Sequence, residues 1–199
     1  MALALNKSSL KQQRDQLATY RRFLPSLDLK RQQLLSTLKE GRAALEAAQT
    51  EVERFAESLE GLYPLLGTST AAALDLSKLV RVRAVRVEEE NVAGARLPVV
   101  REVEVESVPY STLATPFWLD HLVRTLRRMA ELRVLVEVNR IRVERLEVAA
   151  RRITQRVNLF EKVLIPGAEK NIKRIQVFLS DEERAAVVRS KLAKQRQRA

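Results

Sequence analysis

Few side chains of this 199-residue chain could take part in bond-making chemistry, and they are widely scattered. The chain has one histidine, His121, and no cysteine, which excludes thiolate chemistry and a disulfide framework. No second metal-ligating residue stands three or four positions from His121 on the same helical face. Asp181, Glu182 and Glu183 follow Ser180 as in a capped helix start, which we expect here instead of a metal site. We therefore expect no catalytic residue, metal or cofactor, so that the chain by itself is not an enzyme.

The composition favours long helices. Hydrophobic residues make up 46% of the chain and charged residues 31%, whereas only five glycines and six prolines occur. So few glycines and prolines argue against an all-β or loop-rich fold. No uncharged stretch approaches the roughly 18 apolar residues of a membrane span, and the N-terminus has no signal-peptide pattern. We expect a cytoplasmic protein without a segment inserted in the membrane.

The positive charge is concentrated in the last part of the chain. The formal net charge is +11, and residues 116–199 hold 20 of the 36 basic but only 10 of the 25 acidic residues. A basic helix end can meet nucleic acid, an anionic membrane surface or an acidic socket in a protein, because all three have negative potential. Charge alone does not choose among these partners.

Two long stretches, residues 1–66 and 116–199, repeat apolar residues every seven positions. The repeats start at Leu10 and Leu122, and such a period predicts two helices joined along a supercoiled seam. Because proline removes a helical hydrogen bond, we expect kinks at Pro25 and near Pro166. The expected seam residues are Leu38, Leu45, Val52, Leu59, Leu132, Val136, Val143, Leu146, Ile153 and Val157.

The middle segment, residues 67–115, has a different period. Residues 79–87 and 99–105 alternate apolar and charged residues and are rich in valine, as in two β-strands with one covered face. Residues 91–98 contain Gly94 and Pro98 and should form the loop of a β-hairpin spanning about 79–105. The predicted fold class is all-α: a long antiparallel two-helix coiled coil formed by the N- and C-terminal helices, with this small hairpin as an insert.

The helix around Pro166 resembles a known family. Residues 155–166, QRVNLFEKVLIP, are similar to the RRVNALE-type run and Ile-Pro pair of the D subunits of V/A-type rotary ATPases. Residues 27–34 and 91–98 resemble that family's LLKRKRDAL-type and NVMGVKVP-type segments, although Gln155 and Pro25 depart from its pattern. The matching residues on which we focus are Arg156, Asn158, Glu161, Ile165 and Pro166, with Lys191 and Lys194 in a basic tail.

This resemblance implies a central rotor shaft, or stalk, that couples ATP synthesis or hydrolysis to proton or sodium translocation. In that family the paired helices stand inside rings of alternating A and B subunits. F subunits bind beside the helices, and funnel-shaped adaptors join them to the membrane proteolipid rings. By this resemblance the matching residues contact partner subunits. The chain would then be peripheral to the membrane, held there through the complex, and would bind no nucleic acid.

Two other classes of protein remain open from the residues alone. A basic coiled-coil protein that binds nucleic acid would show tight binding that weakens steeply with salt. A structural adaptor would share the coiled coil without needing the motif from Arg156 to Pro166. Of the three readings, the rotor shaft is the one that this motif favours.

Overall fold

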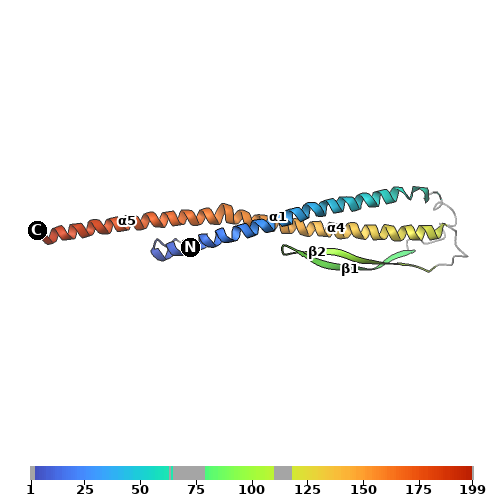
Figure 1. Ribbon diagram of the computed structural model, residues 1–199, viewed down its shortest axis with the longest axis horizontal. Helices are drawn as coiled ribbons and strands as arrows, with labels where there is room; N and C mark the ends of the chain where they lie inside the picture. The colour runs from blue at the N-terminus through green and yellow to red at the C-terminus, as the bar shows by residue number, and fades with distance from the viewer. Residues whose placement is uncertain (1–2, 63, 65–78, 110–117, 199) are drawn as a thin grey trace. The chain divides into compact units, whose positions relative to one another are not determined.

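The structure, a computed structural model, describes residues 3–62, 64, 79–109 and 118–198. In chain order these form α1 (Lys7–Glu57), the 3-10 turn η1 (Glu60–Leu62), β1 (Val80–Val92), β2 (Ala95–Ser107), α4 (Leu119–Leu159), the π-helical turn η3 (Phe160–Leu164) and α5 (Ile165–Arg198) (Figure 1). Contacts group the chain into two units, Met1–Gln32 with Arg151–Ala199, and Gln33–Ala150. The described chain is mostly helical with one antiparallel hairpin, which confirms the predicted fold class.

In the first unit the start of α1 lies antiparallel to α5. The side chain of Asn6 caps α1 by accepting a hydrogen bond from the Ser9 N–H at 2.7 Å. Further along α1, Gln13 accepts a hydrogen bond from the Asn171 side-chain amide at 3.2 Å, and Arg21 pairs with Glu169 at 2.6 Å. Residue numbers rise along α1 as they fall along α5, so the two helices run in opposite directions.

One local sequence signal acts differently from what we expected. The predicted helix start at Ser180 is wrong, because α5 continues from Ile165 to Arg198 without interruption. The helix is already packed before Ser180, because the side chain of Ile175 is completely buried. Pro25 lies inside α1, which continues to Glu57, and the kink expected at this proline stays a prediction.

In the second unit the later part of α1 lies antiparallel to α4. Arg42 of α1 pairs with Glu147 of α4 at 2.6 Å, and Glu51 pairs with Arg128 at 3.1 Å. Gly41 of α1 faces side chains of α4, since a Cβ atom there would lie 3.4 Å from Cδ1 of Leu146. The start of α4 takes part in a buried apolar cluster, which consists of Leu79, Trp118, Leu119, Leu122 and Val123.

The hairpin of the second unit is longer than the alternating pattern predicted. Both strands have 13 residues, and Val92 pairs with Ala95, so the turn contains only Ala93 and Gly94. The predicted loop over residues 91–98 is therefore wrong except at these two positions. Both have positive φ, 51° and 93°, which is the backbone of a tight two-residue hairpin turn. The Asn91 side chain accepts a hydrogen bond from the Gly94 N–H at 3.0 Å and fixes this turn.

Replacing Gly94 by valine should destabilise the hairpin, because an L-residue with a branched side chain resists a φ of 93°. We expect a loss of about 1–2 kcal/mol in the opening free energy of the hairpin. Hydrogen exchange of the β1 and β2 amides measures this loss. The matched control is Ala93→Gly, which should leave exchange unchanged or slower, and equal exchange in both variants would contradict the role of Gly94.

Candidate functional site

The features of the described residues that could carry a function are surfaces of the helices and of the hairpin. No group of three or more histidine, cysteine, aspartate or glutamate residues that could hold a metal ion occurs in the described part of the chain. His121 is exposed in the first turns of α4. Within the same residues, no helix has the length and apolar character needed to cross a bilayer. The candidate sites are the helix seam, the motif around Pro166, the basic end of α5 and the hairpin.

All ten expected seam residues are at least partly covered. Six are less than 9% exposed and four are half-buried. The buried six are Leu38, Leu132, Val143, Leu146, Ile153 and Val157, and the half-buried four are Leu45, Val52, Leu59 and Val136. Their role in transmitting force stays a prediction. Gly41 and Ala48, which the same seven-residue repeat places at seam positions of α1, are buried as well.

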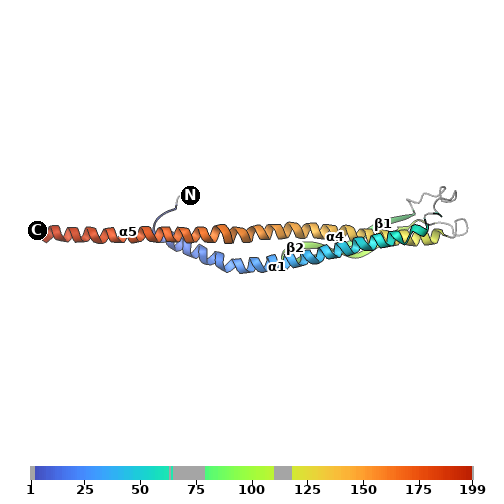
Figure 2. The ribbon, with the colours of Figure 1, turned by 90° about the horizontal axis from the view of Figure 1, so that it is seen from above.

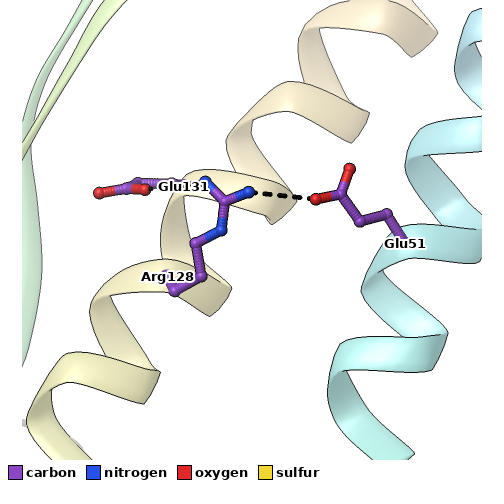
Figure 3. A network of polar contacts seen from close by, with 3 residues as sticks. All are labelled: Glu51, Arg128 and Glu131. Atoms are coloured by element: carbon purple, nitrogen blue, oxygen red, sulfur yellow. Dashed lines mark hydrogen bonds and ion pairs between the residues drawn. The ribbon is translucent and has the colours of Figure 1, made fainter.

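Exposed ion pairs cross between α1 and α4 beside the seam. Figure 3 shows Arg128 of α4 reaching across to Glu51 of α1, while Glu131 lies on its other side, 3.4 Å from the guanidinium. All three side chains are 39–53% exposed. Pairs exposed to this degree contribute about 0–1 kcal/mol each, so the apolar seam and not these charges holds the helices together.

The five motif residues lie at the junction of α4 and α5. The structure places a π-helical turn there, in which the Ile165 N–H bonds to the Phe160 carbonyl five residues earlier. Pro166 follows directly and has no N–H for the usual bond to the fourth residue before it. A π-turn changes the bonding pattern where proline disturbs the α-helix, and such turns are frequent at functional sites. This turn gives the kink expected near Pro166 a physical basis, and the kink itself stays a prediction.

The motif side chains divide into exposed and half-buried ones. Arg156, Glu161 and Pro166 are exposed, while Asn158 and Ile165 are half-buried. Phe160, inside the motif, packs edge-on against Tyr20 of α1 with ring centres 5.5 Å apart. The exposed members are thus available on the surface, whereas the ring contact anchors the π-turn to α1.

The last part of α5 has few polar contacts with α1. Lys7 lies 4.0 Å from Glu183, and every residue from Asp181 to Gln197 is exposed. Lys191 and Lys194 belong to this segment, together with exposed Arg184, Arg189 and Arg196. Val188 and Leu192, one turn apart, are 56% and 54% exposed. This basic end, which we define as residues 184–197, is a helical surface with an apolar strip bordered by cations.

The tip of the hairpin is fastened to α4, and the sequence did not reveal this contact. Arg142 of α4 pairs with Glu90 of β1 at 2.8 Å. Arg145, one turn later, lies 3.7 Å from Glu89 and donates a hydrogen bond to the Arg96 carbonyl at 3.2 Å. The only signal for this clasp is a run of glutamates in one element and two arginines three positions apart in another.

Reversing the charge of Arg142 with Arg142→Glu should loosen the hairpin tip. Because the Glu90 side chain is 50% exposed, we expect an effect of up to about 1 kcal/mol in the opening free energy of the tip amides, measured by hydrogen exchange. The double variant Glu90→Arg with Arg142→Glu should restore most of the protection. If Arg133→Glu, a charge reversal at an exposed arginine of α4 outside the clasp, loosened the tip as much, the clasp would lose its support.

Comparison with known proteins places these features in a family of ATP synthase components. The family of ATP synthase D subunits matches residues 9–195. Among the D subunits of V-type ATP synthases, that of Borreliella burgdorferi is 32% identical over 192 residues, covering 96% of this chain and 93% of that protein. That of Chlamydia pneumoniae is 34% identical, covering 96% and 91%, and that of Chlamydia caviae is 33% identical, covering 98% and 93%. The chain belongs to the family of V-type ATP synthase D subunits, which confirms the resemblance found in its sequence.

Proposed function

We propose that this chain is the central rotor shaft of a V-type ATP synthase, which transmits torque between a catalytic ring and a membrane ring. The observation that carries the proposal is the antiparallel pairing of α1 with α4 in one unit and with α5 in the other. A shaft needs a pair of helices that resists unwinding and needs no catalytic side chains. The membership of the chain in the family of D subunits supports this role.

Torque would pass through the buried seam. Twisting one helix against the other would expose side chains such as Leu146 and Val157, which are 0% and 2% exposed. Exposing apolar surface costs about 25 cal/mol per Å², so a seam of many such residues resists twisting. The exposed ion pairs beside it add little resistance, because water screens them.

The proposed partners follow the family resemblance. Of the A, B and F subunits, A and B form the hexameric ring around the shaft and F binds along it, while a funnel-shaped adaptor connects the shaft to the proteolipid ring. The chain then works on the cytoplasmic side, peripheral to the membrane. Rotation changes the nucleotide affinity of each catalytic site in turn, and it couples ATP synthesis or hydrolysis to proton or sodium translocation. Arg156, Asn158, Glu161, Ile165 and Pro166 would contact these partners.

Direct observation of rotation tests the proposal. The chain has no cysteine, so one cysteine introduced at exposed Glu57, the last residue of α1 and outside the basic end of α5, gives a unique attachment point for a probe. The reconstituted A/B ring is fixed to a surface and supplied with ATP. We expect the probe to turn in one direction only when ATP is present. A chain that assembles with the ring but stays fixed to it would refute the shaft.

The basic end of α5 should guide the shaft within an acidic sleeve of the ring. Lys191→Glu combined with Lys194→Glu replaces two exposed cations by anions. We expect weaker assembly and slower ATP turnover in the reconstituted complex, with the defect most evident at low salt, where charge interactions are least screened. The matched control is Lys170→Glu with Lys173→Glu, two exposed lysines at the same spacing nearer the start of α5. Unchanged turnover of the Lys191 and Lys194 variant would exclude the guiding role.

Nucleic-acid binding is the second candidate, and only the charge of residues 116–199 favours it. The two functions give different results with the purified chain. A nucleic-acid protein would bind DNA or RNA with an affinity that falls steeply as salt rises. The shaft would instead co-purify with A, B and F subunits and would hydrolyse no ATP in isolation.

A further inference from the structure

In the first unit the seam follows the expected seven-residue repeat as far as the π-turn. Ile153 and Val157 are buried, and Phe160 packs against Tyr20 of α1. These positions are separated by four and then three residues, as in a coiled coil. Figures 1 and 2 show the early part of α1 alongside α5 in this unit. On that part of α1 the repeat runs without a break, and its half-buried positions are Leu10, Gln13, Leu17, Tyr20, Leu24, Leu27 and Arg31.

Beyond the π-turn, the covered positions of α5 lie one residue later than the repeat predicts. The repeat predicts Arg174 and Phe178 in the seam, but both are exposed. Its two earlier positions, Gly167 and Asn171, are only half-buried. The apolar residues one position later are covered as much or more, and they are Ala168, Ile172, Ile175 and Leu179. The stripe of α5 has therefore moved by one residue relative to the stripe of α4.

The π-turn accounts for this extra residue. An α-helical hydrogen bond joins a residue to the fourth one before it, whereas a π-helical bond spans five residues. In η3 the Ile165 N–H bonds to the Phe160 carbonyl. One more residue is thus held in this turn, and each later residue takes the place that its predecessor would have in a continuous α-helix. Phe160 is the last position in the old phase and Ala168 the first buried one in the new phase, so the shift falls at η3.

Proline by itself does not explain the shift. Pro166 has no N–H and can disturb the bonding of the turn before it. Pro25 lies inside α1 in the same unit, and there the helix stays α-helical. The repeat of α1 also continues across this proline, since Leu24 before it and Leu27 after it are both half-buried. The different behaviour of the two prolines points to the phase of the seam as the cause of the π-turn.

A π-turn is a place where a helix can change its twist locally. Its N–H groups have acceptors both four and five residues earlier, so one bond can replace another while the helix on either side keeps its own. Glu161, Lys162 and Val163 in this turn are exposed, and their movement uncovers no buried side chain. The flanking segments are closely packed on α1 through Val157 and Ile175, and close packing resists displacement.

We propose that the π-turn is a torsional hinge of the helix pair: it keeps α5 in phase with α1 and opens more readily than the helix on either side. The sequence is one residue away from a stiffer form. Without Lys162, the seam would continue in unbroken steps of three and four residues. Its positions would be Val157, Phe160, Ile165, Ala168, Ile172, Ile175 and Leu179. The hinge does not depend on the proposed function, although in a shaft the twist would concentrate there.

Two single-residue deletions in the full chain test the phase correction. Lys162 in the π-turn and Lys173 in α5 are both exposed lysines. Deletion of Lys162 should leave the melting temperature unchanged or raise it, because the turn can become α-helical with the seam intact. Deletion of Lys173 should lower it by about 5 °C or more, because apolar residues leave the seam on one side of the deletion or the other. A loss after deletion of Lys162 as large as that after deletion of Lys173 would overturn the proposal.

Hydrogen exchange of the full chain measures the opening of the hinge. We expect the amides of residues 161–165 to exchange about tenfold faster than those of residues 153–157 and 172–176, because local opening follows the weakest bonding. Deletion of Lys162 should remove most of this difference. Equal exchange in the three segments of the native chain, or exchange in the turn that the deletion does not slow, would overturn the hinge.

Replacing Pro166 by alanine separates the two possible causes of the turn. Pro166→Ala restores the missing N–H but leaves the number of residues between Phe160 and Ala168 unchanged. We expect a crystal structure of this variant to retain the π-helical bond from Ile165 to Phe160, because the seam still requires the extra residue. Continuous α-helical bonding through residues 160–166 would assign the turn to proline and overturn the proposal.

Discussion

Replacing Leu146 with alanine is expected to lower the free energy of unfolding by about 2–5 kcal/mol. The side chain of Leu146 is completely buried, and its Cδ1 lies against Gly41 of the facing helix. Removing it takes away apolar contacts and leaves a cavity that two rigid helices cannot easily close. Chemical denaturation of the isolated chain, followed by helical circular dichroism, measures the loss.

The control for this change is Leu135→Ala on the same helix. Leu135 is 37% exposed, and a leucine at such a position should cost less than about 1 kcal/mol when shortened. Both changes have the same chemistry and similar helix propensity, so their difference isolates burial in the seam. Equal losses for the two variants would show that α4 and α1 are not packed together at Leu146.

Replacing Gly41 with leucine is expected to destabilise the second unit by about 1–3 kcal/mol, because Gly41 is buried against Leu146 and Val143, which leave no room for a large side chain. A Cβ atom alone would lie 3.4 Å from Leu146 and 3.6 Å from Val143, which are ordinary contact distances. Gly41→Ala should therefore fit and should stabilise the chain by about 0.5–1 kcal/mol through helix propensity. The sign of the effect should change between alanine and leucine at one position.

Gly167 provides the matched position. A Cβ atom there would meet no other atom within 4 Å, so Gly167→Ala and Gly167→Leu should both leave stability unchanged or raise it. Thermal unfolding of the four variants measures the contrast. Destabilisation by Gly167→Leu as large as that by Gly41→Leu would mean that backbone effects, and not close packing of α1 on α4, decide the result.

Much of the fold could be predicted because it depends on local patterns. The seven-residue repeats from Leu10 and Leu122 predicted the two helical regions, and every expected seam residue is at least half-buried. Valine-rich alternation around Gly94 predicted the hairpin, although its strands extend further toward the turn. More residues of α4 are buried than the seven-residue repeat predicts. Val123 and Val138 lie outside the repeat and are buried, because α4 contacts both α1 and the hairpin.

The sequence by itself determined which residues are helical, where the chain turns back and which family motif it carries, since these follow from spacing within one segment. Only the tertiary structure decided the pairing of Gly41 with Leu146, the clasp of Arg142 with Glu90, and the turn at which the stripe of α5 moves by one residue. A heptad repeat looks the same after a shift of seven residues, and one extra residue held in a turn moves every later position. Register is therefore fixed by contacts between distant segments, which no local pattern specifies.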